Sequence, residues 1–588
     1  MELVRLEHTE REIQERVRLE RERLRKELGV DEQRRKHFRR PEERPFTADQ
    51  RAHTTVLFGG LTWKHEHLIH GSLEGLGYKC EYLPTPDVQA FRLGKEYGNN
   101  GQCNPTYFTV GNLVQYLQGL EEKGLTRQQI IDNYVFFTAG ACGPCRFGMY
   151  EAEYRLALRN SGFDGFRVLL FQQSGGLSQA GVAAGLEMNL DFFLAILNSL
   201  NLGDLVGALG HLVRPYEVNE GQTDKVLDDS VRFLHEVMES KKRPEIEGRW
   251  ARLLGNKKQA ATYLQKFINQ LRSEHYVEGL RQVRKRFEEI EVDFTRVRPI
   301  VHITGEFWAQ TTEGDGNFKM FRFLEKEGAE VVVEPVGTWI LYMLHQAVQK
   351  ARDTRNVGFN APAWRIDKRV RHEWGYRRRL MQLKLAESVF RREFNRLRKT
   401  LGGTVAPLND QYELQRLGHP YYNSRSGGGE GHLEVAKNIY YSNKDLAHMV
   451  LSLKPFGCMP STQSDGAQAA VTSRYKDMIY LPIETSGEGA VNAYSRVQMA
   501  LGEARTKAGE EFKQALGSCG FGLSEIRAFA DDHPELKRPF FRIPHRKGVV
   551  GKAANYVLQV SELMRKEMKS RISLPSVTGG EADARSGS

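Results

Sequence analysis

Two cysteines separated by two residues are the most chemically suggestive feature of the sequence. Cys142 and Cys145 lie in the segment "TAGACGPCRFGMYEAEY", between an apolar run and a helical pattern. At the start of a helix this spacing would put both sulfurs on one face, near unpaired N–H groups and the positive end of the helix dipole. Arg146 adds a cation. We expect these features to lower the pKa of both thiols and to favour metal ligation or nucleophilic chemistry.

Two other cysteines have similar surroundings. Cys103 in "NNGQCNPTYF" and Cys458 in "KPFGCMPS" occupy loop-like segments that contain Gly or Pro. Cys458 directly follows a predicted strand, as the first pair does, and such positions lie where a parallel sheet presents its ligands. The remaining two, Cys80 and Cys519, have weaker contexts, and we expect them to be small buried side chains without a ligand.

Three kinds of chemistry fit these cysteines. A thioredoxin-like dithiol needs only the pair, and it leaves Cys103 and Cys458 unexplained. Structural zinc held by four thiolates is usually signalled by two close pairs, whereas this chain combines one pair with two distant single cysteines. An iron–sulfur cluster bound from separated loops suits the spacing, and the neighbouring glycines leave room for it. The spacing alone leaves all three open.

The elements that must position these cysteines alternate between strands and helices. Strands are predicted at "TTVLFGG", "DNYVFFTAG", "FRVLLFQQSGG", "RPIVHITGEF", "AEVVVEP", "LAHMVLSLKP" and "MIYLPI". Strands that alternate with helices imply crossover connections and a mostly parallel sheet. The predicted fold class is therefore α/β, with two Rossmann- or flavodoxin-like parallel-sheet domains and helical insertions.

The same patterns divide the chain of 588 residues into segments. Heptad-like spacing of Leu and Val among charged residues predicts a helix at the N-terminus, and small polar residues predict a disordered C-terminal tail. The predicted segments are a charged helical segment at 1–48, an α/β domain with the Cys-x-x-Cys at 49–185, a helical region at 186–295, a second α/β domain at 296–573 with a basic helical insertion at 364–400, and a tail at 574–588.

Composition points to a cytoplasmic protein. The chain starts with charged residues rather than an apolar leader, and its longest apolar region, "LDFFLAILNSLNLGDLVGALGHLV", is interrupted by Asn198, Asn201 and Asp204, so we expect no membrane span. Six cysteines in a reducing compartment argue against a disulfide framework. The formal charge of +11 comes from local runs of Arg. No nucleic-acid-binding motif accompanies them, so nucleic acid is not an expected partner.

Four other segments have competing interpretations. "ETSGEGAVNAYSRVQ" is an anion cradle or a Gly-rich connection, and "GGGEGHLEVAK" is a hinge or an active-site lid. The basic stretch at 364–400 is a solvated helix face or a dock for an acidic activator or CoA. His65, His67 and His70 in "WKHEHLIHG" lack the spacing of a zinc protease, and we expect surface or packing histidines.

Several long phrases resemble one superfamily. "NNGQCNPTYFTVGNL", "FTAGACGPCRFGMYEAEYRLAL", "LKPFGCMPSTQSDG" and "ETSGEGAVNAYSRVQ" resemble the 2-hydroxyglutaryl-CoA dehydratase / acyl-CoA reductase superfamily. The likeness is closest to the C-terminal half of acyl-CoA dehydratase activase-related proteins, and it covers roughly residues 50–570. It implies a 4Fe–4S cluster bound between α/β domains, with Cys103, Cys142, Cys145 and Cys458 as its ligands.

The resemblance also implies a reaction type and a partner. Members receive single low-potential electrons from a separate ATP-hydrolysing iron–sulfur activator and use them on a 2-hydroxyacyl-CoA thioester. Six cysteines allow, by number, the double cubane of relatives that reduce small molecules. This chain has no P-loop motif, so the activator would act in trans.

The expected function is therefore a dehydratase (lyase) or reductase acting on a CoA thioester or small molecule, in a homo- or hetero-oligomer. The alternatives are a non-catalytic iron–sulfur electron carrier or assembly subunit, and a zinc-stabilised binding scaffold.

Overall fold

The computed structural model describes residues 2–27, 44–140, 145–172, 185–242, 258–360 and 365–572. The chain divides into two units, Met1–Arg44 and Pro45–Ser588. In the first, the described residues form one helix, α1 (Glu2–Glu27), as the N-terminal pattern predicts. Cys142 and the predicted disordered tail at 574–588 lie outside the described residues.

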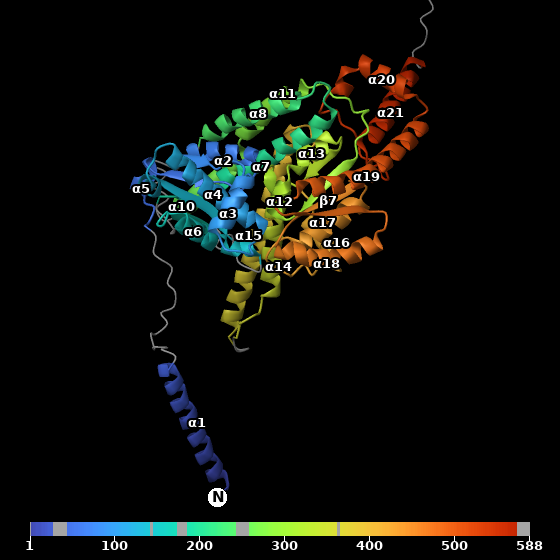
Figure 1. The fold of residues 1–588 in the computed structure, drawn as a ribbon. Helices are drawn as coiled ribbons and strands as arrows, with labels where there is room; N and C mark the ends of the chain where they lie inside the picture. The colour runs from blue at the N-terminus through green and yellow to red at the C-terminus, as the bar shows by residue number, and fades with distance from the viewer. Residues whose placement is uncertain are drawn as a thin grey trace, which may run out of the picture. The chain divides into compact units, whose positions relative to one another are not determined.

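Two parallel sheets of four strands each organise the described part of the second unit (Figure 1). The first has the order β2-β1-β3-β4 and is built from β1 (Thr55–Phe58), β2 (Cys80–Tyr82), β3 (Tyr134–Gly140) and β4 (Arg167–Gln172). The second has the order β6-β5-β7-β8 and is built from β5 (Ile300–Gly305), β6 (Glu330–Val333), β7 (Met449–Pro455) and β8 (Ile479–Thr485). The α/β prediction with two parallel-sheet domains is confirmed. Among the strands in the described residues, the three-residue β2 is the one that was not predicted.

In both sheets the strand order reverses at the first strand, β1 in one and β5 in the other. In the first sheet β1 pairs in parallel with β2 on one side and with β3 on the other, and β5 pairs in the same way with β6 and β7 in the second. Ligands of open α/β sheets bind at such a switch point, outside the carboxyl ends of the strands. The loops after β1, β3, β5 and β7 are therefore the places where a site is expected.

Helices cover the faces of both sheets. The first sheet is joined to α2 (Trp63–Glu74), α3 (Val88–Tyr97), α4 (Asn104–Glu122), α5 (Arg127–Asn133) and α6 (Tyr150–Asn160). In the chain, the helical region that follows the first sheet and precedes the second contains α7 (Leu190–Val213), α8 (Gln222–Glu239), α10 (Lys258–Arg272) and α11 (His275–Glu288). The second sheet is joined to α12 (Phe307–Thr311), α13 (Met320–Lys326), α14 (Val336–Asp353), α15 (Ile366–Thr400), α16 (Gln411–Gly418), α17 (Gly431–Asn443), α18 (Met459–Arg474), α19 (Ala490–Cys519), α20 (Leu523–Asp532) and α21 (Lys552–Ile572).

Each sheet has its own apolar core. Leu57 and Phe136 of the first sheet pack with Leu113 of α4 and Ala157 of α6. A separate cluster joins the second sheet to α13 and α19, with members that include Val301, Leu451, Ile483, Leu324 and Val497. The buried strands β1 and β7 are apolar because both of their faces are covered by helices.

Helix α7 is the apolar region that the sequence singles out. Residues Leu190–Tyr216 are long and apolar enough to cross a membrane, but most of them are buried inside the protein. Asp204 on this helix accepts hydrogen bonds from the backbone N–H groups of Val336 and Gly337, at 2.8 and 2.9 Å. The apolar face packs against α2, α8 and α14 in the largest core cluster. In this structure α7 is therefore a core helix that is partnered by protein.

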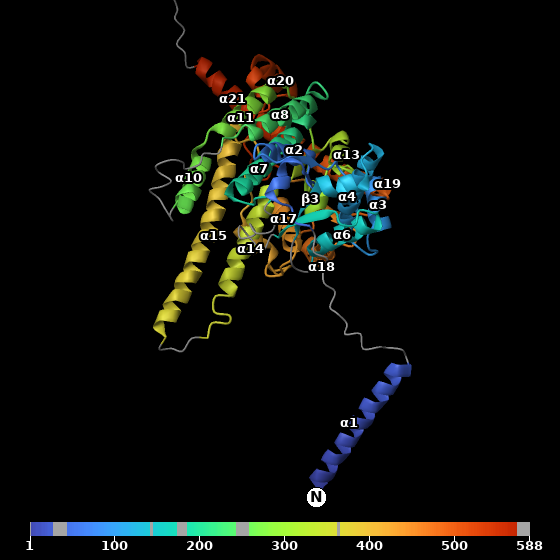
Figure 2. The ribbon, with the colours of Figure 1, turned by 90° about the vertical axis from the view of Figure 1, so that its left-hand side faces the viewer.

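The predicted basic insertion is a single long helix, α15, which packs beside α14 (Figure 2). Its second half buries Phe394 and Leu397 in the main core, whereas Ile366, Val370 and Trp374 in its first half are exposed.

Candidate metal centre at the junction of the two sheets

Cys103 is held at the turn of a tight helical hairpin. Helices α3 and α4 cross at Gly94 and Gly111, where an added Cβ atom would lie only 2.0 Å from the carbonyl oxygen of Tyr107 and 1.7 Å from that of Ala90. Cys103 is the N-cap residue of α4. Its buried sulfur is hydrogen-bonded to the hydroxyl groups of Thr106 and Tyr150, at 3.1 and 3.2 Å.

Cys458 lies directly against this hairpin. It is the N-cap residue of α18, three residues after the end of β7. The preceding Gly457 has φ of +75°, and an added Cβ atom there would lie 3.3 Å from the Cα atom of Cys103. The backbone N–H of Asn104 donates to the carbonyl oxygen of Phe456 at 3.1 Å. The chain on both sides of Cys103 therefore contacts the loop that carries Cys458.

Cys145 approaches the same place from the first sheet. It follows β3 and is the N-cap residue of a 3₁₀ turn, Arg146–Met149, which precedes α6. Its Cβ atom lies 3.8 Å from where a Cβ atom on Gly429 would be, and that position is also 2.3 Å from the ring of Pro460. The prediction that the pair opens an α-helix is thus wrong at Cys145, because a 3₁₀ turn intervenes.

The described cysteines of the predicted set, Cys103, Cys145 and Cys458, therefore meet where the two sheets adjoin. Each caps the N-terminus of a helical segment, where backbone N–H groups and the helix dipole favour negative charge. The other two described cysteines lie elsewhere. Cys80 belongs to β2, and the Cys519 thiol donates to the carbonyl oxygen of Ala515 within α19.

Three carboxyl groups surround these cysteines and were missed in the sequence. Glu306 directly follows β5 and accepts a hydrogen bond from the N–H of Ala309 at 2.9 Å. Glu430 accepts from the N–H of Phe307 at 2.6 Å, so both carboxyl groups hold the first turn of α12. Glu434 accepts from the hydroxyl groups of two serines at the start of α18. A glutamate directly after the strand "IVHITG" was the available signal for the first of them.

Burial dominates the electrostatics of the site. It raises the pKa of Glu306 to about 7 and, together with the nearby Glu306, raises the pKa of Glu430 to about 8. Burial also raises the pKa of the Cys145 thiol to about 12 and the pKa values of Cys103 and Cys458, and the charge of Glu306 adds to each increase. The expected lowering of the thiol pKa is therefore wrong for Cys145, because desolvation and nearby acids outweigh the helix dipole, and Cys142 lies outside the described residues.

The donor set nevertheless suits a bound metal cluster, since a coordinating metal deprotonates a thiol outright. Two buried polar atoms beside the cysteines, Oε1 of Gln102 and Nε of Arg146, have no hydrogen-bond partner within the described ranges. Of the two, only Nε of Arg146 is a donor; cluster sulfurs accept hydrogen bonds from N–H groups of this kind, and such bonds tune the reduction potential. The residues present fit an iron–sulfur cluster in their chemistry and their polarity.

The sulfurs of Cys103, Cys145 and Cys458 do not all lie within 4.8 Å of one another. Tetrahedral zinc with Zn–S bonds of 2.3 Å places its thiolates about 3.8 Å apart. In the described part of the chain, only one group of three or more His, Cys, Asp or Glu has its ligand atoms within 4.8 Å of one another, and it contains no cysteine. A cubane binds each thiolate to a different iron, so its ligands lie farther apart than those of a single ion.

Two Gly-rich segments with competing interpretations also border the cysteines. The carbonyl oxygen of Thr485, at the start of "TSGEG", accepts a hydrogen bond of 2.6 Å from the side chain of Asn104. Gly487 in the same loop lies against the ring of Phe91 on α3. Gly429 in the second segment faces Cys145. Both loops pack against elements of the first sheet's domain, as connections between the two halves would.

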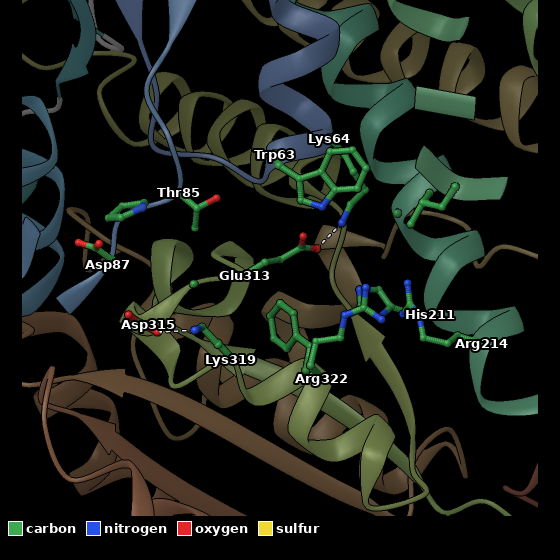
Figure 3. Close-up of a pocket in the computed structure, with 15 residues that line it drawn as sticks. Trp63, Lys64, Thr85, Asp87, His211, Arg214, Glu313, Asp315, Lys319 and Arg322 are labelled. Carbon is green, nitrogen blue, oxygen red and sulfur yellow. Dashed lines mark hydrogen bonds and ion pairs between the residues drawn. The ribbon is translucent and has the colours of Figure 1, made fainter. Parts of the chain in front are cut away.

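A cavity of about 350 Å³ lies at the other end of α12 (Figure 3). Its wall includes the start of α2, the loop after β2, one face of α7 and the segment Glu313–Asp315. Charged side chains point into it from both domains, and Figure 3 shows Lys64 of α2 paired with Glu313. Arg214 and Arg322 both bind Asp224 at the rim.

This cavity does not contain the cysteines, but α12 connects it to Glu306, one of the carboxyl groups beside them. Glu306 is the N-cap residue of the five-residue helix α12 and Glu313 lies two residues beyond its end, so a helix about 7.5 Å long lies between them in the chain. The cavity volume is at the lower end of the range for small-molecule sites. The two features therefore flank one short helix.

Comparison with known proteins adds no further identification. No protein-family model matches this chain, and no curated protein matches it. The resemblance to the dehydratase superfamily therefore remains a hypothesis that rests on the quoted phrases and on the site that they form in the structure.

Proposed function

We propose that this protein is an iron–sulfur protein of the 2-hydroxyacyl-CoA dehydratase type. In this proposal Cys103, Cys145 and Cys458, with Cys142, hold a 4Fe–4S cluster. The protein takes low-potential electrons from a separate ATP-dependent activator and drives reductive or radical chemistry on a CoA thioester or small molecule. The reaction belongs in a reducing compartment such as the cytoplasm, because the cluster and its free thiols are sensitive to oxidation.

One observation carries the proposal: three cysteines that are far apart in the sequence converge at the junction of two parallel sheets, each at the N-terminus of a helical segment. Chance packing of free cysteines has no reason to select N-caps, whereas thiolate ligands are stabilised there. The three described sulfurs do not all lie within 4.8 Å of one another, and this supports a cluster over a single zinc ion.

The surrounding residues can support such chemistry. The cluster, when bound, supplies one-electron reduction of a substrate held beside it. The burial of Cys103 and Cys458 keeps water away from the metal. Glu306 and Glu430 both raise the thiol pKa values of Cys145 and Cys458, and N–H groups of α12 hold both carboxyl groups in place, which suits the transfer of a proton to a leaving hydroxide.

Anaerobic purification with analysis of iron and acid-labile sulfide tests this proposal. We expect about four irons and four sulfides per chain, with an EPR signal after reduction, and loss of most of the iron in Cys103→Ala, Cys145→Ala and Cys458→Ala. Cys519→Ala is the matched control, because its thiol is buried in a helical core away from the site. It should keep its full iron content.

Two results would overturn the proposal. The first is zinc without acid-labile sulfide in the wild-type protein. The second is equal iron content in the three site variants and the Cys519→Ala control. A cluster that is present but cannot be reduced by any activator would instead favour a structural role over the electron-transfer chemistry.

A further inference from the structure

A second group of metal-ligand side chains lies on two helices next to the first sheet. His70 and Glu74 are one turn apart on α2, and His235 faces them from α8. The Nδ1 atom of His70 is 3.0 Å from Nε2 of His235. The Oε2 atom of Glu74 is 3.2 Å from the same Nε2 atom and 3.6 Å from Nδ1 of His70. Three potential ligand atoms therefore point at one another.

These distances match those around a single tetrahedral ion. Zinc with bonds of 2.0–2.2 Å to nitrogen and oxygen separates its ligand atoms by about 3.3–3.6 Å. The three observed separations are 3.0, 3.2 and 3.6 Å, so two of them are slightly shorter than this range and one lies at its upper end. Two imidazoles and one carboxylate form a common ligand set of zinc sites that keep a fourth position open.

The imidazole of His70 is oriented for ligation by its other nitrogen. Its Nε2 atom lies 2.9 Å from the carbonyl oxygen of Cys80, which can only accept a hydrogen bond. Nε2 therefore carries the proton in the neutral ring, and the lone pair of Nδ1 faces His235 and Glu74. A backbone carbonyl that fixes the tautomer of a ligating histidine is a common partner in metal sites.

Two glycines bring the helices close enough for this group to form. Gly71 and Gly75 directly follow the two ligands on α2. An added Cβ atom at Gly71 would lie 2.5 Å from the carbonyl oxygen of His235, and one at Gly75 would lie 2.4 Å from that of Glu239. Any larger residue would push α8 away from α2. The glycines thus let His235 reach the two side chains of α2.

Solvent can reach the three potential ligand side chains. The side chains of His70, His235 and Glu74 are 21%, 19% and 36% exposed. An ion can therefore reach the three atoms, and the fourth position of a tetrahedral ion would be filled by water. His67 is close, with its Nδ1 atom 3.0 Å from the hydroxyl oxygen of Tyr82, but it does not belong to the group whose ligand atoms all lie within 4.8 Å of one another.

We propose that His70, Glu74 and His235 bind one divalent transition-metal ion, with zinc the best match, and that this ion links α2 to α8. The site is separate from the cysteines and does not depend on the proposed iron–sulfur function. Binding to the folded state alone would stabilise the protein in proportion to the logarithm of the zinc concentration, once that concentration exceeds the dissociation constant.

Titration of the chelator-treated full-length protein with Co²⁺ and Zn²⁺ under anaerobic conditions tests the site. Cobalt bound by thiolates gives an intense sulfur-to-metal charge-transfer band in the near ultraviolet, which a site of two histidines and one glutamate does not. We expect one equivalent of cobalt to bind without this band. His70→Gln and His235→Gln should lower the affinity for zinc about 100-fold or more, and Glu74→Gln, which keeps an oxygen, about 10-fold.

His275→Gln is the matched control, because this half-buried imidazole on α11 contacts α8 but lies outside the group. It should bind zinc like the wild type. Circular dichroism without metal checks that each variant folds, and zinc should raise the Tm of the wild type but not of His235→Gln. Equal affinity in His235→Gln and His275→Gln would overturn the proposal, as would cobalt that binds only with the thiolate band. Unchanged iron content in the three variants would show that the two sites are independent.

Discussion

The two parallel sheets have the same strand order but place different chemistry at their switch points. In each, the first strand is followed by a buried or half-buried glutamate that accepts backbone N–H groups, Glu66 after β1 and Glu306 after β5. The third strand of each, β3 or β7, is followed by a cysteine, Cys145 or Cys458.

The sheets differ in the segments that come after β2 and β6. After β2 the chain forms the short α3–α4 hairpin, whose turn delivers Cys103. After β6 it enters α14 and the long helix α15, which contribute no cysteine. Each sheet thus places one glutamate and one cysteine at its switch point. The α3–α4 hairpin of the first domain adds Cys103 as the third thiol.

The largest effect on stability is expected at the ion pair between the halves. Lys64 of the first domain is buried against Glu313 of the second. Glu313→Leu leaves the ammonium group buried without its carboxylate, so we expect the free energy of unfolding to fall by about 3 kcal/mol in urea titrations.

The double variant Lys64→Met/Glu313→Leu should recover most of this loss, because an apolar pair can replace a buried ion pair. The control Lys319→Met removes a surface pair with Asp315 and should cost less than about 1 kcal/mol. A double variant as unstable as Glu313→Leu alone would show that the two side chains are not coupled.

A somewhat smaller effect is expected where the two cysteine loops meet. Gly457→Ala forces a residue with a side chain into φ of +75° and places its Cβ atom 3.1 Å from the carbonyl oxygen of Gln102. We expect a loss of about 1–3 kcal/mol and a lower iron content per chain.

The control for this change is Gly517→Ala, an exposed position within α19 that has open space around it. Higher helix propensity should stabilise this variant by up to about 1 kcal/mol. If Gly457→Ala kept iron at the wild-type level, the contact between the two loops would not be needed for cluster binding.

The third effect is a dependence of stability on pH that comes from the glutamate of the first sheet. Burial raises the pKa of Glu66 from 4.5 to about 8. Because its folded-state pKa lies above its unfolded value, the stability that this carboxyl contributes is complete below pH 4.5 and is lost as the pH rises through about 8.

Glu66→Gln should therefore flatten the fall of Tm between about pH 5 and about pH 9, while the exposed Glu122→Gln should leave it unchanged. If the Tm of Glu66→Gln fell as steeply with pH as that of the wild type, other titrating groups would be responsible for the pH dependence.

Much of the fold could be predicted from local patterns. The seven predicted strands are all present, because apolar β-branched runs between turn residues are a short-range signal. The metal-free thiol pKa could not be predicted, because it depends on burial and on carboxyl groups that are hundreds of residues away. The group of His70, Glu74 and His235 was missed for a related reason: the sequence shows only the two ligands of α2, whereas His235 comes from α8.

The α/β class, the strand–helix alternation and the choice of candidate cysteines followed from the amino-acid sequence alone. Spacing and residue type are local properties that folding does not change. The meeting of Cys103 with Cys458, the three glutamates beside them and the approach of His235 to Gly71 became visible only in the folded chain. These are contacts between elements distant in sequence, and they depend on how two sheets and their helices pack.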